Sequence, residues 1–273
     1  MKRMVCGVAY DSHRGWVPMR LEPSIRIHTD MIAPNAKSPA AGILAALLLS
    51  ACGSGGSSNG NPTPSSQGSY DLQAAMAALV KSGLSANVIL SGMAIVNGTS
   101  NPLTGTGTLT LSPGVSGMFN GTMAQLQTQS ISGTVTVAGQ TSPYSSSVVN
   151  AYESATTAVV GESQSTEFDV APQPIMIPTV VGTSVMMLGT LNRYSDSTLS
   201  VALGTVQVSV AVTLIPVDPG SSEVVQFTYK VYNTNQALVE TDTFSYNFTE
   251  NNLLSLNSAA TQSAAGTLTV MPQ

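Results

Sequence analysis

Two pairs of acidic residues have types and spacing that could support chemistry. Glu240 and Asp242 lie two residues apart, as do Glu167 and Asp169, so each pair shares one face of a strand. Such a pair could bind Ca²⁺ through oxygen ligands or serve in glycoside hydrolysis. No EF-hand spacing accompanies either pair, and acidic residues are normally exposed. We therefore expect solvated acids on an outward face, no cofactor and no metal site, with Glu240 and Asp242 as the candidates should a metal bind.

Three tyrosines recur at matching positions of a weak internal repeat. Tyr152, Tyr194 and Tyr232 each precede a polar turn, which is followed by a short apolar run and a second expected strand. The simplest account is a series of hairpins. The tyrosines could line a carbohydrate-binding surface, but at repeat positions we expect them to cover a sheet edge. Asp196 and Asn233 fall in equivalent turns, where local hydrogen bonding explains them without a ligand.

The segment that could carry covalent chemistry is Leu49-Ser50-Ala51-Cys52, at the end of an apolar run over residues 40–51. This run is too short to span a bilayer as a helix, which needs about 20 apolar residues. The Gly-, Ser- and Pro-rich residues 53–69 follow, and we expect them to form a disordered linker. The motif, the run before it and the linker after it resemble those of a bacterial lipoprotein precursor.

This resemblance implies that Cys52 is the lipidated residue, carrying an acyl group such as palmitate, and that the signal peptide is cleaved between Ala51 and Cys52. It implies a place in the cell envelope and no particular activity. In Gram-negative members of this class, an Asp after the cysteine favours retention in the inner membrane. The residue here is Gly53, so the resemblance favours the outer membrane over the inner.

The residues before Cys52 divide into two parts. Residues 31–51 have the positive charge, apolar run and small residues of a lipoprotein signal peptide. Residues 1–30 mix charged residues with Trp16 and contain no apolar run. We interpret 1–30 as an extension from a start codon assigned too early, with translation beginning at Met31, or as an atypically long positive region. Residues 52–69 would then be the lipidated cysteine and linker, and residues 70–273 the folded body.

Cleavage before Cys52 would remove most of the reactive side chains. Both histidines, the only Trp and Cys6 lie upstream, which excludes Ser-His-Asp and Cys-His catalysis and zinc sites of His or Cys in the mature chain. Three basic residues against eleven acidic ones leave the mature part with a net charge of −8. Without a basic patch we expect no nucleic-acid binding and no attraction to anionic lipid, so the acyl groups on Cys52 must make the membrane contact.

The folded body is expected to be mainly β behind one helix. Apolar residues at helical spacing predict an amphipathic helix over 70–82, with Ser69 as N-cap and Gly83 as its stop. From residue 87 the period is two, most clearly over 205–214, which favours antiparallel sheets in a sandwich or partly open barrel built of hairpins. The prolines of 172–178 mark a crossing or an edge. Two small β domains divided there are the alternative.

Two functional hypotheses follow from these observations. The first is a non-enzymatic envelope lipoprotein that acts in binding, assembly or surface structure, with a protein or an envelope polymer as partner. The second is a periplasmic carrier of a lipid or other apolar ligand. The carrier hypothesis predicts a large cavity between helix 70–82 and the sheet, with Met76, Met186 or Met187 at its wall. A hydrolase that uses only carboxylates is the enzymatic alternative.

Overall fold

The computed structural model describes residues 71–273 except residues 166, 215–222 and 249–252. This part of the chain contains one helix, α1 (Leu72–Ser82), and a single sheet of thirteen strands. The strands are β1 (Leu84–Val96), β2 (Thr99–Leu111), β3 (Val115–Phe119), β4 (Thr122–Val137), β5 (Gln140–Tyr152), β6 (Val159–Ser163), β7 (Phe168–Ile175), β8 (Met186–Tyr194), β9 (Ala202–Leu214), β10 (Glu223–Asn233), β11 (Leu238–Phe248), β12 (Leu254–Ser263) and β13 (Gly266–Pro272).

Helix α1 is capped at both ends by its own neighbours. Oδ1 of Asp71 accepts a hydrogen bond from the backbone N of Ala74 at 2.9 Å, so Asp71 holds the N-cap position that we had given to Ser69, which lies outside the described residues. At the other end Gly83, with φ of 71°, donates to the carbonyl of Leu79 at 2.8 Å. The residues at helical spacing are all buried: Leu72, Ala75, Met76, Leu79 and Val80.

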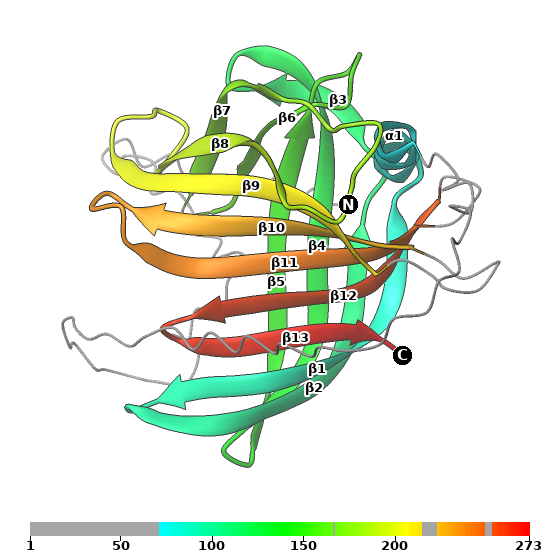
Figure 1. Cartoon of the computed structure of the whole chain (residues 1–273). Helices are drawn as coiled ribbons and strands as arrows, with labels where there is room; N and C mark the ends of the chain where they lie inside the picture. The colour runs from blue at the N-terminus through cyan, green and yellow to red at the C-terminus, as the bar shows by residue number, and fades with distance from the viewer. Residues whose placement is uncertain (1–70, 166, 215–222, 249–252) are drawn as a thin grey trace, which may run out of the picture.

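The sheet closes on itself. Its strands follow the order β2-β1-β13-β12-β11-β10-β9-β8-β7-β6-β5-β4-β3, and β2 pairs in addition with β4, from Leu103↔Val137 to Leu111↔Gln129. Twelve antiparallel strands therefore form a closed barrel. The thirteenth strand, β3, pairs with the first residues of β4, on the same side of β4 as β2. Figure 1 shows β9 to β13 running across the view with β4 and β5 crossing behind them, and α1 at one end of the barrel.

The expectation of a sandwich or a partly open barrel is therefore wrong in detail, although the hairpin meander and the antiparallel pairing are present. The physical reason is the length of β4. This strand has 16 residues, so it pairs with β5 along most of its length while β3 and β2 share its other side. Strands on both sides of residues 172–178 belong to the same sheet, since β7 pairs with β6 and β8.

The prolines at 172 and 174 lie in a wide irregularity of β7. Val159 of β6 pairs with Ile175 and Gly161 pairs with Val170, so residues 171–174 of β7 have only one residue of β6 opposite them. Pro172, Gln173 and Pro174 are exposed there. This arrangement keeps residues without an N–H out of the ladder. The expected crossing or edge is instead an irregularity within an internal strand, since β7 pairs with both β6 and β8.

Three glycines permit the closure. At Gly133 of β4 a Cβ would lie 2.1 Å from the carbonyl oxygen of Thr106 and 2.5 Å from the Cα of Gly107. At Gly105 and Gly107 of β2 a Cβ would lie 2.2 Å and 2.5 Å from carbonyl oxygens of β4. Every atom in the way is backbone. The two strands can therefore approach this closely only because none of the three residues has a side chain.

We expect Gly133→Ala to destabilise the protein, because the added Cβ must separate β2 from β4 at the closure of the barrel. The expected loss in free energy of unfolding is about 1–3 kcal/mol, measured by urea denaturation. Gly182→Ala is the matched control, because a Cβ at Gly182 meets nothing within 4 Å. Equal stability of the two variants would show that the seam does not depend on Gly133.

Candidate functional site

A hollow inside the barrel, which we call the chamber, lies between α1 and the inward faces of the strands. About 80 Å³ of it admits the centre of a water-sized sphere, within about 910 Å³ of space that includes its opening to solvent. Since about 10–15 Å³ of such space holds one water, the chamber has room for about five to eight waters or a compact ligand. Its lining residues are Met76, Leu79, Leu111, Gln129, Val148, Asn150, Tyr152, Val159, Glu162, Gln164, Ile177, Val206, Val208, Phe227, Tyr229, Val231, Asp242, Phe244 and Tyr246.

Helix α1 forms one wall of the chamber through Met76 and Leu79. Hydrogen bonds from the barrel hold the helix in place. The amide Nε2 of Gln127, a fully buried residue of β4, donates to the carbonyl of Leu79 at 3.0 Å. At the start of the helix, the backbone N of Leu72 donates to the carbonyl of Thr179 at 2.9 Å. The helix therefore belongs to the barrel interior.

An aromatic wall of the chamber is built by the adjacent strands β10 and β11. Phe227 and Tyr246 meet edge to face with ring centroids 6.3 Å apart, and Tyr229 and Phe244 do the same at 5.8 Å. Phe227 and Tyr229 alternate along β10, and Phe244 and Tyr246 along β11, as the period of two expected from residue 87 onward predicts. Alternation of side chains along each strand, together with the antiparallel register Phe227↔Phe244, brings all four rings to the inner face.

Burial raises the pKa of the phenols in the chamber. Desolvation raises the pKa of Tyr246 to about 12 and that of Tyr152 well above its usual range, with Tyr246 and Glu162 adding to the effect on Tyr152. Desolvation also raises the pKa of Tyr229 well above 10, and Tyr152, Glu162 and Asp242 act in the same direction. These phenols are therefore neutral at pH 7, and Tyr229 lies within the electrostatic reach of both carboxylates.

Two carboxylates line the chamber: Glu162 on β6 and Asp242 on β11. Oδ1 of Asp242 accepts a hydrogen bond from Oγ1 of Thr261 at 2.7 Å, which fixes the carboxylate on its strand. The lining contains no Lys, Arg or His. The chamber thus combines an apolar and aromatic surface with two acidic groups.

The expectation that Glu240 and Asp242 lie solvated on an outward face is wrong. Both residues are half-buried, and Asp242 lines the chamber because it shares the inward face of β11 with Phe244 and Tyr246. Within the described part of the chain, no three His, Cys, Asp or Glu side chains lie close enough together to hold a metal ion.

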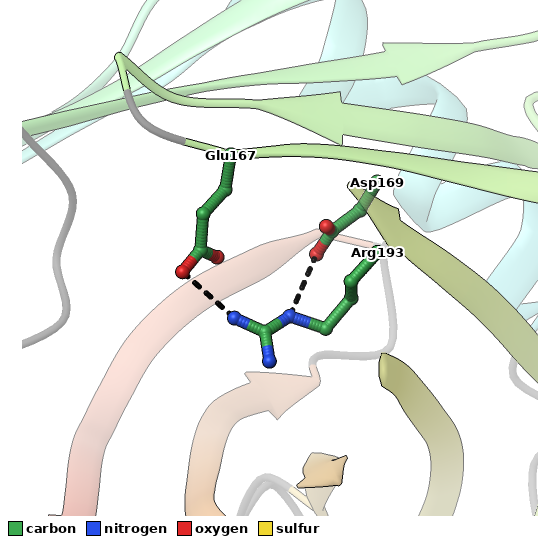
Figure 2. A network of polar contacts seen from close by, with 3 residues as sticks. All are labelled: Glu167, Asp169 and Arg193. Atoms are coloured by element: carbon green, nitrogen blue, oxygen red, sulfur yellow. Dashed lines mark ion pairs between the residues drawn. The ribbon is translucent and has the colours of Figure 1, made fainter. Parts of the chain in front are cut away.

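The second predicted pair is also shielded from water instead of solvated, because Asp169 is buried and Glu167 is half-buried. Figure 2 shows both carboxylates turned toward Arg193 of β8. Nη2 of Arg193 lies 2.7 Å from Oε1 of Glu167, and Nε lies 3.9 Å from Oδ2 of Asp169. The side chains of Arg193, Glu167 and Asp169 are 7, 13 and 2 % exposed, so this ion pair network is shielded from water.

The ion pair network of Arg193, Glu167 and Asp169 lies next to the chamber along the sheet. Asp169 is the register partner of Arg193 on one side and of Glu162 on the other, so the three residues follow one another across β8, β7 and β6. Arg193 does not line the chamber. The one buried cation among the described residues is therefore engaged by Glu167 and Asp169, next to the chamber wall.

The repeat tyrosines separate in the structure. Each lies at or next to the end of its strand, as predicted, but Tyr152 lines the chamber while Tyr194 and Tyr232 are half-buried elsewhere. Asp196 and Asn233 have the local turn role that we expected. Oδ1 of Asp196 accepts from the N of Thr198 at 2.8 Å, and Oδ1 of Asn233 accepts from the N of Asn235 at 2.9 Å. Hydrogen bonds from Thr198 also lower the pKa of Asp196.

Of the three methionines predicted at a cavity wall, only Met76 is there. Met186 and Met187 are 41 and 57 % exposed and do not contribute to the lining. Sequence reasoning missed Glu162, Asn150 and the two glutamines of the lining, Gln129 and Gln164. No motif marks them. Asn150 lies two residues before Tyr152 on the same strand face, and this parity was the one available signal.

Several predictions lie outside the described residues. These are the lipidated Cys52 with its cleavage site after Ala51, the signal peptide 31–51, the extension 1–30 and the linker up to residue 69. In the part that is described, no helix is long and apolar enough to cross a membrane.

Removal of Arg193 should be strongly destabilising, because Glu167 and Asp169 would keep their buried negative charges without the guanidinium. We expect Arg193→Met to reduce the free energy of unfolding by about 3–5 kcal/mol, measured by denaturant titration. The triple variant Arg193→Met, Glu167→Gln, Asp169→Asn should recover a large part of this loss.

The matched control for this prediction is Lys230→Met, which removes one positive charge from an exposed site. It should change the stability by no more than about 0.5 kcal/mol. If Arg193→Met were as stable as this control, the buried ion pair network would have no structural importance.

Comparison with known proteins gives no family for this chain. No family model matches it, and no curated protein does. Among solved structures, a domain named as an outer membrane lipoprotein-sorting protein from Vibrio parahaemolyticus aligns at 12 % identity and a TM-score of 0.27, over 74 % of this chain and 90 % of that one. A DUF1329 family protein from Desulfovibrio piger aligns at 12 % identity and a TM-score of 0.26, over 73 and 88 %. Because both TM-scores are low, the functional proposal rests on the chamber.

Proposed function

We propose that this protein is a lipid-anchored protein of the bacterial envelope whose barrel binds a compact, largely apolar ligand without transforming it. Cys52 would attach it to the membrane, with the outer membrane favoured over the inner. The observation that supports the ligand is the chamber, which lies between α1 and the strands as a carrier requires. A protein or an envelope polymer would be the partner that delivers or receives this ligand.

The size of the chamber restricts the ligand. The carrier hypothesis predicted a large cavity. The chamber is small, since only about 80 Å³ of it can hold the centre of a water-sized sphere. An apolar cavity of about 150 Å³ binds a single benzene molecule. A whole lipid therefore does not fit the chamber as it stands. The matching ligand is therefore one that inserts the end of a short apolar chain into the chamber and keeps the rest of the molecule at its opening to solvent.

The chemistry of the lining supports binding over catalysis. It contains no His, Cys or Lys that could act as a nucleophile or as a base near neutral pH. Its three phenols have pKa values raised above 10 and are therefore poor nucleophiles at pH 7. A hydrolase based on Glu162 and Asp242 is the remaining enzymatic candidate, and release of product from a bound ligand would identify it.

The anchor is tested by metabolic labelling with radiolabelled palmitate. The unmodified chain should incorporate label and sediment with the outer-membrane fraction. Cys52→Ala removes the thiol that carries the acyl group, so this variant should incorporate no label. Labelling that persists in Cys52→Ala would refute the anchor, and sedimentation of the native protein with inner membranes would refute the preference for the outer membrane.

Ligand binding is tested by titration calorimetry of hexan-1-ol into the full chain carrying Cys52→Ala, which needs no membrane. Val159→Phe fills the chamber from a half-buried lining position, and we expect it to weaken hexanol binding about tenfold or more. Val201→Phe makes the same change at a residue that is 55 % exposed and outside the lining, so its affinity should equal that of the parent.

Circular dichroism should show the same strand content in both variants. Absence of hexanol binding to the parent chain, or equal affinities of the Val159 and Val201 variants, would contradict a binding role for the chamber.

A further inference from the structure

An uncharged segment with five exposed apolar side chains connects β7 to β8 beside the start of α1. We propose that residues 176–187 form a membrane-contacting surface, whose occupant is the interfacial region of a lipid bilayer. This surface is distinct from the ligand site in the chamber, and the choice of a bilayer as its occupant rests on the proposed anchor at Cys52. Composition, restraint of the backbone and position support the inference.

The composition of the segment suits an apolar contact. Residues 176–187 include no charged residue, and the nearest charges along the chain belong to Asp169 and Arg193 of the buried ion pair network. Exposed apolar side chains that gather within a short stretch mark sites of contact with a membrane or a partner. The expected net charge of −8 gives no attraction to anionic lipid, so a bilayer contact has to be apolar. The exposed apolar residues are Met176, Val180, Val185, Met186 and Met187.

The backbone of the segment is held on both sides of Val181. The backbone N of Leu72 in α1 donates to the carbonyl of Thr179, and the N of Val212 in β9 donates to the carbonyl of Gly182, each at 2.9 Å. Val181 itself is half-buried and packs against the core. The outward position of the large apolar side chains is therefore part of the folded structure.

The short ladder between β7 and β8 lets the segment leave the sheet. These strands pair only from Phe168↔Tyr194 to Val170↔Asn192. In the described ladders, residues 186–191 of β8 have partners on β9 alone. The chain between β7 and β8 is therefore free to run beside α1, where Figure 1 shows it.

The position of the segment favours a bilayer as its occupant. Because Thr179 accepts the hydrogen bond from Leu72, the segment touches the first residue of α1, where the chain from Cys52 enters the body. The 18 residues 53–70 separate Cys52 from the described body, and a chain of this length reaches at most about 60 Å when extended. An anchored body is thus held by this point, and the surface beside it is the one that faces the membrane.

The segment also contributes to the chamber. Ile177 is buried and lines the chamber, next to the exposed Met176. A bilayer in contact with the segment would bring its acyl chains close to the chamber, which suits a ligand that inserts the end of an apolar chain.

A tryptophan reporter in an anchored chain tests this surface. Trp16 is the only tryptophan, and Cys6 and Cys52 are the only cysteines. The full chain carrying Trp16→Phe and Cys6→Ser is made by cell-free synthesis, so that Cys52 keeps its thiol. This thiol is then coupled to a maleimide lipid in phosphatidylcholine vesicles, which supplies the anchor chemically.

Two reporter positions with nearly equal exposure are compared in this chain. Met187→Trp lies in the segment, and Val201→Trp is the matched control; the native residues are 57 and 55 % exposed. Met187 pairs with Ser209 and Val201 precedes the partner of Tyr194, so the sites lie on the order of 25 Å apart along β9. Phosphatidylcholine brominated near the headgroup end of its acyl chains should quench the Met187 reporter about threefold more than the Val201 reporter.

Added charges test whether the contact is apolar. In the Met187 reporter chain, Val180→Asp with Val185→Asp should reduce the quenching to the level of the Val201 reporter, because carboxylates resist desolvation in the interface. Leu238→Asp with Val239→Asp adds the same charges at exposed apolar residues of β11 and should leave the quenching unchanged. Circular dichroism checks that these variants fold, and the comparison of the two reporters does not depend on them.

Equal quenching of the two reporters would overturn the membrane-contacting surface, as would quenching at Met187 that persists with both added aspartates. A shift of the Met187 reporter emission to shorter wavelength that appears without vesicles and grows with protein concentration would assign the surface to a second copy of this chain, and would also overturn the inference. Because the maleimide lipid replaces the acyl groups, these results are independent of acylation in the cell. Absence of palmitate label would refute the anchor alone, and the reporters would still decide the surface.

Discussion

The pairing of β2 with β4 is the contact on which the interior of this protein depends. Without it the thirteen strands would form an open sheet with two free edges and a broad apolar face exposed to water. With it the inward faces of twelve strands enclose one space, and only α1 remains to cover an end. The contact is possible because Gly105, Gly107 and Gly133 let two backbones approach within distances that a Cβ would forbid.

Closure has an electrostatic consequence. Of the nine acidic residues in the described part of the chain, Asp196 is the one that is exposed. The carboxylates on inward faces lose much of their hydration. Burying each of them costs free energy unless hydrogen bonds or an ion pair compensate for the lost water. Arg193 serves Glu167 and Asp169. Glu162 and Asp242 line the chamber together with phenols that burial keeps neutral.

The period of two predicted the buried row of β9 correctly, and the same rule applied to Asp242 would have placed it on the inward face. Val206, Val208, Val210 and Val212 are buried as the period of two required. Asp242 has the parity of Phe244 and Tyr246, so its inward position followed from that row, and the general tendency of acids to be exposed was the wrong guide. The Asn97-Gly98 and Asn120-Gly121 pairs, with positive φ throughout, were available as hairpin signals for the turns between β1 and β2 and between β3 and β4.

Other features depended on contacts that no local pattern encodes. Simple alternation from Val159 would have turned Glu162 outward. The irregularity between Val159 and Gly161, where β6 meets the prolines of β7, shifts the register and lets both residues line the chamber. The meeting of Glu167 and Asp169 with Arg193 joins neighbouring strands separated by a long connection. Closure pairs β2 directly with β4, although β3 lies between them in the sequence. The expected partly open barrel differs from the structure by this one pairing.

Charged residues make up only 8 % of this chain, and many of the exposed positions of its strands are Ser or Thr. Placing acids inside a barrel reduces stability unless each is compensated, and a fold selected only for stability would favour apolar residues at those positions. The interior of this barrel keeps the ion pair network at Arg193 and, beside it, a chamber lined by aromatic rings and two carboxylates. This departure from the simplest core is the kind of local cost that proteins retain at binding sites. The chamber is for this reason a better guide to function than the apolar clusters that surround it.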